Sequence, residues 1–286
     1  INISILLQNL NWRRQMKDSK NTENLHHKDY GLVGREFFED YRGEDEIVTS
    51  FELHDKLIAE KREPIISVRS KIAGFDNACE GFQDGELIVI SGVTKQGKTL
   101  LAQTFTVNFS KQEKLPCWFS YEVPHRQFLD QFPMLPLFYL PQKNKAQDFD
   151  WFMERCLEAF FKYGARIFFI DHLHYLIDMA RVKNPSLDIG VIVRRIKRFA
   201  VENDFVIFLL AHVGKNTGED LSWKDLRDSS FIGQESDCVI MIQRTPKLGI
   251  NTAKASVEFH RRTGVMEWMV NLEKKHGLLV EVFKNE

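Results

Sequence analysis

The segment "SGVTKQGKTLLA", residues 91–102, is the most informative part of this chain for its fold class. It has glycine at 92 and 97, followed by Lys98 and Thr99, in the order Gly-x-x-x-x-Gly-Lys-Thr. The preceding run "ELIVI" is continuously apolar, which is typical of a strand buried on both faces, and an apolar helical pattern follows the loop. A glycine-rich loop between a strand and a helix predicts a phosphate-binding loop, the alternative being a chance glycine loop with an exposed lysine.

The residue types of this loop suit a nucleoside triphosphate with Mg²⁺. Glycines let successive backbone N–H groups point inward, and the helix N-terminus adds the positive end of its dipole. Lys98 is expected to contact the β and γ phosphates, and the Thr99 hydroxyl to bind Mg²⁺. The expected nucleotide-binding residues are Gly92, Val93, Thr94, Lys95, Gln96, Gly97, Lys98, Thr99 and Leu100.

Apolar runs recur from residue 68 onward, and each of the first five is followed by a helical stretch. They are "ELIVIS", "LPCWFSYE", "ARIFFIDHL", "DFVIFLLAH" and "DCVIMIQR". Continuously apolar strands separated by helices predict an α/β fold with a mainly parallel sheet and right-handed crossovers. The last three runs, "KASVEFHRR", "GVMEWMVNLE" and "GLLVEVF", have no helices between them and predict an antiparallel extension.

The first part of the chain differs from the rest. Residues 1–63 are polar, charged and short of strand patterns, so we expect a short N-terminal segment followed by one ATPase domain over residues 64–286. Within the segment, "TSFELHDKLIAEKREP" predicts an amphipathic helix. Thr49 and Glu52 have the spacing of a capping box, and Pro64 is expected to end the helix.

Composition excludes several classes of protein. The 286 residues are 43% hydrophobic with a net charge of −1, so a full core is expected and any nucleic-acid contact must be local. Four cysteines without a CxxC pair argue against structural zinc and disulfides and favour a reducing, cytoplasmic setting. Apolar runs of about seven residues are too short to span a membrane, and no signal peptide is recognised. The chain begins at Ile1 and not at methionine, which leaves room for a preceding domain.

Polar side chains follow three of the apolar runs, where parallel strands bind ligands. Asp171 after "RIFFI" could hold Mg²⁺ through water, or cap the next helix. Glu122 after "CWFSY" could orient the attacking water, or be a solvated loop residue. His212 after "IFLLA" could hydrogen-bond a γ-phosphate, or be purely structural.

With these residues placed, residues 68 to 286 resemble the RecA-fold ATPase domain of DnaB-type hexameric replicative helicases. Four pieces carry the resemblance: "IAGFDNACEGFQDGELIVISGVTKQGKTLLAQ" with Walker A, "CWFSYEVP", "IFFIDHLHYL" with Walker B, and "DLRDSSFIGQESDCVIMIQR". The last is the most specific, because few RecA-like ATPases outside the helicases carry it.

The resemblance implies roles for individual residues. Glu122 matches the catalytic base, Asp171 the Walker B carboxylate, and His212 the γ-phosphate sensor, which is glutamine in most DnaB sequences and histidine in phage and plasmid relatives. Arg262 matches an arginine finger that acts on the neighbouring subunit. His260 stands where the family has lysine, so either His260 or Arg261 is the candidate for the second contact in trans. The 44–62 helix resembles the linker helix that docks on a neighbouring subunit.

The resemblance also places single-stranded DNA in a pore loop, at Arg227, Asp228 and Ser230. Short side chains let backbone N–H groups reach phosphates, and one arginine adds charge; the alternative is a turn with a surface Asp–Arg pair. The basic run "RRIKR", residues 194–198, is interpreted as the solvated face of a helix, because isoleucines at 189, 192 and 196 form an apolar stripe.

Together these features predict an ATP hydrolase: a DNA helicase motor that uses ATP and Mg²⁺, acts on single-stranded DNA in replication, and works as a homo-oligomeric, hexameric ring with ATP between subunits. Two alternatives remain at this point. One is a RecA- or clock-type ATPase in which ATP controls assembly, and the other is a helicase-derived accessory ATPase with low turnover.

Overall fold

The computed structural model describes residues 46–59, 66–176, 185–212, 229–245 and 249–283. The chain divides into two compact units, Ile1–Glu63 and Pro64–Glu286. In the first unit, helix α3 (Ser50–Ala59) begins at the predicted capping box. Glu52 N donates to Thr49 Oγ1 at 3.1 Å, and Thr49 N donates to the Glu52 carboxylate at 2.8 Å. Pro64, the predicted end of this helix, lies outside the described residues.

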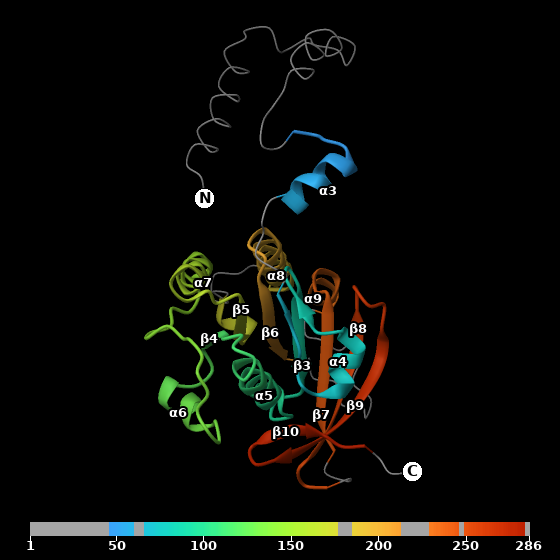
Figure 1. Ribbon diagram of the computed structural model, residues 1–286. Coiled ribbons are helices and arrows are strands. Elements are labelled where there is room, and N and C mark those ends of the chain that lie inside the picture. Colours follow the sequence, from blue (N-terminus) through green and yellow to red (C-terminus); the bar gives the residue numbers. More distant parts are fainter. Residues whose placement is uncertain (1–45, 60–65, 177–184, 213–228, 246–248, 284–286) are drawn as a thin grey trace, which may run out of the picture. The chain divides into compact units, whose positions relative to one another are not determined.

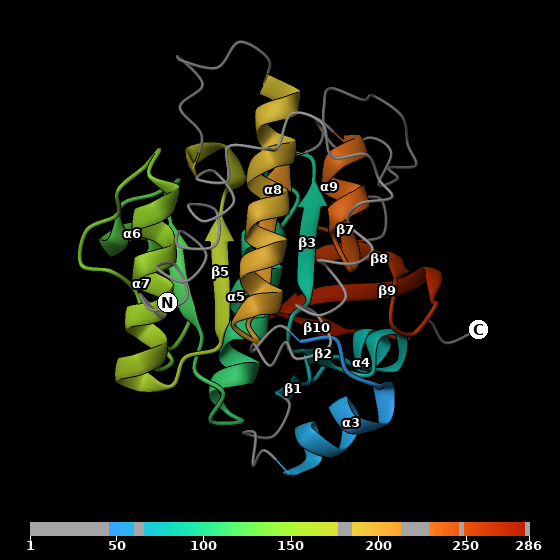
Figure 2. The same cartoon turned by 90° about the horizontal axis from the view of Figure 1, so that it is seen from above.

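The second unit contains an eight-stranded sheet in the order β10-β9-β8-β7-β3-β6-β5-β4. Its parallel part consists of β4 (Cys117–Ser120), β5 (Ile167–Asp171), β6 (Val206–His212), β3 (Leu87–Gly92) and β7 (Cys238–Arg244). Its antiparallel edge consists of β8 (Thr252–His260), β9 (Met266–Lys275) and β10 (Leu278–Glu281). The arrows of β5 and β3 point the same way in Figure 2. The predicted parallel sheet with an antiparallel C-terminal extension is confirmed.

Helices cover both faces of the sheet (Figure 1). One face packs against α4 (Ala73–Cys79) and α5 (Lys98–Ser110), and the other against α7 (Phe149–Tyr163), α8 (Pro185–Glu202) and α9 (Ser229–Glu235). Neighbouring residues of each central strand face opposite cores: Ile88 and Ile90 belong to the α5 side, and Leu87 and Val89 to the α8 side. Burial on both faces is the reason these strands are continuously apolar.

Phenylalanines fill much of the space on the α5 side. Phe105 and Phe109 of α5 are fully buried and contact Phe208 of β6, at ring-centroid distances of 5.9 and 5.7 Å. Trp118 stacks on Phe169 at 4.6 Å. The phenylalanine excess in the sequence is therefore core packing, which fixes α5, and with it the loop before α5, against the sheet.

The smaller elements are a two-stranded pair, β1 (Ser67–Val68) with β2 (Phe82–Gln83), the short helix α6 (His125–Asp130) and the 3-10 helix η2 (Leu173–Leu176). No helix among the described residues is both long enough and apolar enough to cross a membrane.

The basic run 194–198 lies on α8, whose apolar stripe faces the core as predicted, with Val193 buried and Ile192 only partly buried. Each basic side chain lies next to an acid. The pairs are Arg194 with Glu235, Arg195 with Asp150, Lys197 with Asp237, and Arg198 with Glu202. Since every cation of the run has a carboxylate partner, this helix face offers little net charge to a polyanion.

Candidate nucleotide-binding site

The phosphate loop joins β3 to α5, and its two glycines are required by the backbone. A Cβ atom on Gly92 would lie 2.2 Å from the carbonyl oxygen of Ile242 in the neighbouring strand β7, so no other residue fits there. Gly97 is the N-terminal cap of α5 and has φ of 105°, in the left-handed region that favours glycine. The loop thus lies at the carboxyl end of the central strand, at the N-terminus of a 13-residue helix.

Lys98 and Thr99 begin this helix and point toward neighbouring strand ends. The buried Lys98 ammonium group donates to the carbonyl oxygens of Gly92 and Val93 at 3.0 and 3.2 Å. The Thr99 hydroxyl donates to Oδ2 of Asp171, the last residue of β5, at 2.9 Å. A hydroxyl and a carboxylate side by side next to a phosphate loop are the oxygen ligands that Mg²⁺ accepts, so these two residues fit the ion.

Three polar residues predicted from strand ends reach the same cavity as the loop. Asp171 ends β5, His212 ends β6, where it is paired in register with Gly92, and Glu122 follows β4 by two residues. All three line a cavity of about 660 Å³ together with loop residues Thr94, Lys95, Gly97, Lys98, Thr99 and Leu100. Segments far apart in the sequence thus meet at the carboxyl ends of the parallel strands.

Two of the charged groups in this cavity, Asp171 and Lys98, are buried, whereas Glu122 is exposed. Burial raises the pKa of Asp171 to about 6; the Glu122 charge adds to the rise, while the hydrogen bond from Thr99 and the Lys98 ammonium oppose it. Burial lowers the pKa of Lys98, and the carboxylates of Asp171 and Glu122 partly offset this. Such desolvated, mutually perturbed charges are typical of functional sites.

Replacing Asp171 by asparagine is expected to stabilise the protein at pH 8. A pKa of about 6, against an ordinary value of about 3.9, means that keeping this carboxyl ionised costs about 3 kcal/mol. We expect a gain of about 1–3 kcal/mol in the free energy of unfolding at pH 8. The gain should shrink as the pH falls from about 6 to about 4, where the folded wild type holds the carboxyl protonated. Urea unfolding without Mg²⁺ at pH 8, 6 and 5 measures this; an equal gain at every pH would contradict it.

His172 is a residue of this site that the sequence interpretation did not single out. Its Nδ1 lies 3.8 Å from Oε2 of Glu122, and its ring meets the His212 ring edge-on with centroids 4.4 Å apart. Burial, with the neighbouring His212, lowers the pKa of His172 to about 3, so the ring is neutral at physiological pH. Ligand atoms of Glu122, His172 and His212 all lie within 4.8 Å of one another, a grouping that could hold a metal ion. The sequence feature that could have singled out His172 is its position directly after Asp171, at the end of an apolar strand.

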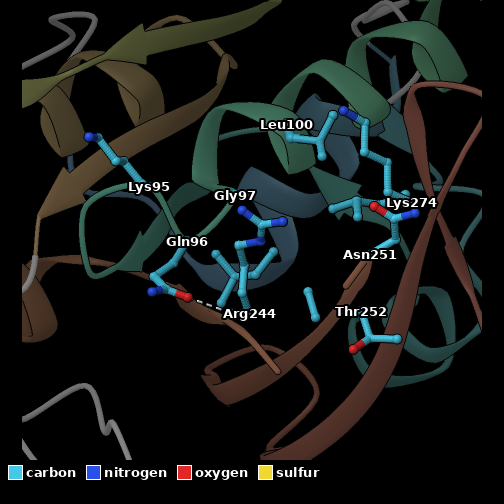
Figure 3. A pocket seen from close by; sticks show the side chains of 11 residues that line it. Lys95, Gln96, Gly97, Leu100, Arg244, Asn251, Thr252 and Lys274 are labelled. Atoms are coloured by element: carbon cyan, nitrogen blue, oxygen red, sulfur yellow. Dashed lines mark hydrogen bonds between the residues drawn. The ribbon is translucent and has the colours of Figure 1, made fainter. Parts of the chain in front are cut away.

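A second, smaller cavity of about 130 Å³ lies beside the phosphate loop (Figure 3). Lys95, Gly97, Leu100 and Lys274 line both cavities. The smaller one is otherwise bounded by Gln96, Ile242, Arg244, Asn251, Thr252, Ala253 and Leu279. The side-chain oxygen of Gln96 accepts from Arg244 N at 2.6 Å, which ties the loop to the end of β7.

Arg262 lies at the opposite end of the sheet from its own phosphate loop. It follows β8, whose last residue His260 pairs with Cys238, and Cys238 is level with Ile88 at the start of β3. The loop follows the other end of β3, a strand of six residues, which is about 17 Å long. Arg262 Nε donates to the carboxylate of Glu86, the residue just before β3, at 2.8 Å. The structure therefore does not bring Arg262 together with the other predicted catalytic residues of its own chain.

The candidates for a second contact next to Arg262 differ in exposure. His260 is only 1% exposed, and its ring nitrogens lie against Thr263 and Glu86. Arg261 is exposed, and its guanidinium donates to the carbonyl oxygen of Gln234. Between these two, Arg261 is the one at the surface.

The structure describes only one of the three residues predicted to bind DNA. Arg227 and Asp228 lie outside the described residues. Ser230 is the second residue of α9, so it belongs to a helix and not to a loop.

The order of the sheet, the glycine loop before α5 and the carboxylates at neighbouring strand ends define a RecA-like P-loop ATPase domain. Family models agree: residues 68–137 match the model described as "ATPase: KaiC", and residues 141–277 match "DnaB-like helicase C terminal domain". With these two consecutive matches, the domain resembles the ATPase domain of the DnaB-type replicative helicases.

Comparisons with individual proteins agree with the family models. The chain is 24% identical over 216 residues to the replicative DNA helicase DnaB of Treponema pallidum (strain Nichols), covering 63% of this chain and 48% of that protein. It thus spans about half the length of this curated relative. Two solved structures, each 18% identical, share its fold. One is described as an ATPase domain, with a TM-score of 0.66 over 82% of this chain and 97% of that chain. The other is a DnaB-like replicative helicase described with its primase interactions, with a TM-score of 0.65 over 96% and 75%.

Proposed function

We propose that this chain is the motor of an ATP-dependent DNA helicase that moves along single-stranded DNA during replication inside the cell. The observation that carries the proposal is the single cavity in which Lys98, Thr99, Glu122, Asp171 and His212 meet, within a domain that matches the DnaB-like helicase model. In this proposal, residues 64–286 form the motor domain, and residues 1–63 form a short N-terminal segment with a linker-type helix.

Each residue of the cavity would have one task in ATP hydrolysis. Glu122 would take a proton from water as the water oxygen bonds to the γ-phosphorus and the bond to the β–γ bridging oxygen breaks. Lys98 would neutralise charge on the β and γ phosphates. Thr99 and Asp171 would hold Mg²⁺, which supplies further charge neutralisation, and His212 would contact the γ-phosphate.

The smaller cavity beside the loop would take the nucleoside part of ATP. It lies directly next to Gln96 and Gly97, and Leu100 and Ile242 give it apolar walls. Arg244 offers a planar guanidinium that can stack on a base without reading its edge. Together, the two adjoining cavities would hold the phosphates and the nucleoside of one ATP molecule.

Arg262 would act on ATP held by a neighbouring copy of the chain. It lies at the far end of its own central strand, so it cannot reach its own phosphate loop without refolding the sheet. Completing the site therefore requires a second subunit. This requirement supports an oligomer with ATP between subunits, which we propose to be a six-membered ring, and Arg261 would supply the second contact.

Single-stranded DNA would be held through phosphates by Arg227, Asp228 and Ser230. We expect Arg227→Ala to weaken binding about equally for different sequences, since one arginine beside small residues has no framework for reading base edges. It should also flatten the plot of log affinity against log salt, by about 0.7 per lost phosphate contact. Titrations of two unrelated oligonucleotides across a salt series measure both effects. If the salt slope and the DNA-stimulated ATPase both stay at wild-type values, the DNA is bound elsewhere.

A second candidate function has one observation in its favour. Residues 68–137 match the KaiC model, which suits an ATPase in which nucleotide controls assembly and does not drive movement. The two functions differ in what ATP and DNA do: a closed ring with DNA-stimulated turnover supports the motor, and an open filament or slow turnover indifferent to DNA supports the alternative.

The deciding experiment measures ATP hydrolysis with and without single-stranded DNA, together with strand displacement on a forked duplex. We expect DNA to stimulate hydrolysis and the fork to be opened only with ATP and Mg²⁺. Hydrolysis without stimulation or displacement would remove the helicase assignment while leaving the nucleotide site in place.

A further inference from the structure

A buried glutamate fastens the β8–β9 turn that carries Arg262. Glu86 is 6% exposed, and its Oε1 accepts from Arg262 Nε at 2.8 Å and lies 3.2 Å from His260 Nε2. Its Oε2 accepts from Gln83 N at 2.8 Å. Burial alone would raise the pKa of Glu86, but the hydrogen bonds from His260, Arg262 and Gln83 outweigh burial and hold the pKa below its usual range. The carboxylate is therefore charged, and three groups from two segments of the chain converge on it.

A second nitrogen of the Arg262 guanidinium group, Nη2, also donates hydrogen bonds within the chain. Nη2 donates to the carbonyl oxygens of Cys79 and Gly81 at 2.6 and 2.7 Å. The next residue, Thr263, donates to the carbonyl oxygen of Ala78 at 2.8 Å. The turn is thus tied to the end of α4. Within the described part of the chain, only Nη1 lacks such an acceptor; it lies 3.8 Å from the exposed carboxylate of Glu80.

This arrangement fixes which edge of the guanidinium can face another molecule. Arginine has five N–H donors in a rigid fork, and the Nε and Nη2 donors are used within the chain. The Arg262 side chain is still 29% exposed. Its Nη1 edge makes no hydrogen bond among the described residues and lies 3.8 Å from the exposed Glu80 carboxylate, so this edge is the one that can contact another molecule. A side chain fixed in advance loses less conformational entropy when it binds.

We propose that Glu86 is a positioning residue for Arg262, which holds the guanidinium so that its Nη1 edge is presented to the nucleotide of the neighbouring subunit. The inference rests on the proposed role of Arg262 in trans and adds the group that orients it. Glu86 itself would touch neither nucleotide nor water. The opposite role, a salt bridge that restrains Arg262 until it is released, predicts a faster enzyme when Glu86 is neutralised.

The test is Glu86→Gln, with Asp84→Asn as its matched control. Asp84 is partly buried and lies in the same connection, but its carboxylate accepts from Ile66 N at 2.8 Å and lies near Arg166. We expect Glu86→Gln to lower the kcat of DNA-stimulated ATP hydrolysis by about tenfold to a hundredfold with KM for ATP nearly unchanged, because the variant's own phosphate loop is intact. Asp84→Asn should stay within about threefold of wild type.

Mixed assemblies separate positioning from a general structural defect. Glu86→Gln subunits mixed with Lys98→Ala subunits should regain activity, because an intact loop then meets an intact Arg262 turn. Glu86→Gln mixed with Arg262→Ala should regain none, since both lack the same half of the site. Should Glu86→Gln fail to fold, Glu86→Asp keeps the charge but shortens the reach, and it should show the same pattern of complementation.

These experiments distinguish a failure of the proposed role of Arg262 from a failure of the positioning role of Glu86. If Arg262→Ala hydrolyses ATP normally, the proposed role of Arg262 is wrong and the inference fails with it. If Arg262→Ala is inactive while Glu86→Gln matches or exceeds wild type, only the positioning role fails. Loss of activity in Glu86→Gln without complementation by Lys98→Ala would also overturn it.

Discussion

Glu122→Gln should still bind ATP but hydrolyse it about 10²–10⁴-fold more slowly, the range lost when a general base is removed. Glutamine has nearly the same shape and can still hydrogen-bond a water molecule, but it cannot accept the proton. Lys98, Thr99 and Asp171 remain in place around the phosphates, so affinity should change little. The expected result is a protein that accumulates bound ATP.

Two measurements check this result. Fluorescent-nucleotide binding gives the affinity, and single-turnover hydrolysis gives the chemical step separately from product release. Lys98→Ala is the contrasting variant, because it should lose both binding and turnover when the phosphates lose their cation. If Glu122→Gln hydrolyses ATP at the wild-type rate, the assignment of Glu122 as the base is wrong.

Arg262→Ala should lower hydrolysis by about 10³-fold or more, the effect of removing an arginine finger in other phosphoryl-transfer enzymes. The loss should appear in assembled protein, since the finger and the phosphate loop of one chain lie at opposite ends of the sheet. Mixing Arg262→Ala subunits with Lys98→Ala subunits should restore part of the activity. In a mixed assembly, some loops of the first variant face an intact Arg262 of the second.

Arg261→Ala is the matched control, because it removes a guanidinium from the same turn. We expect a smaller loss there. Failure to regain activity at any mixing ratio, with mixed assembly verified by a tagged subunit, would show that Arg262 does not act in trans.

The polar residues that follow the parallel strands at their carboxyl ends were the most predictable part of this molecule. Continuously apolar runs predicted the parallel strands, and the rule that ligands bind at the carboxyl ends of such strands singled out Asp171, Glu122 and His212 as neighbours of the phosphate loop. The structure places all three in one cavity. Their roles there stay predictions until the variants are measured.

Other features depend on which strands become neighbours, and sequence order does not state that. Arg244 ends a predicted parallel strand and could have been found by the same rule, but Lys274 reaches the smaller cavity from the antiparallel edge, where no such rule applies. Glu86 and Arg262 are 176 positions apart and meet because β8 pairs with β7 and β7 pairs with β3. The short elements α4, β1 and β2 were also missed, because they carry too few residues for a periodic pattern.

In the proposed oligomer, the separation of the phosphate loop and the Arg262 turn at the two ends of β3 would give each subunit unlike sides, one that receives an arginine and one that donates it. Two copies related by a twofold axis would meet through identical patches, so such a dimer cannot put one subunit's turn onto the other's loop unless both patches contain both features. Contacts between unlike sides repeat head to tail, and they end only when the last subunit meets the first. The proposed assembly would therefore have one direction of rotation around its axis, and hydrolysis at each junction would depend on one particular neighbour and not on both.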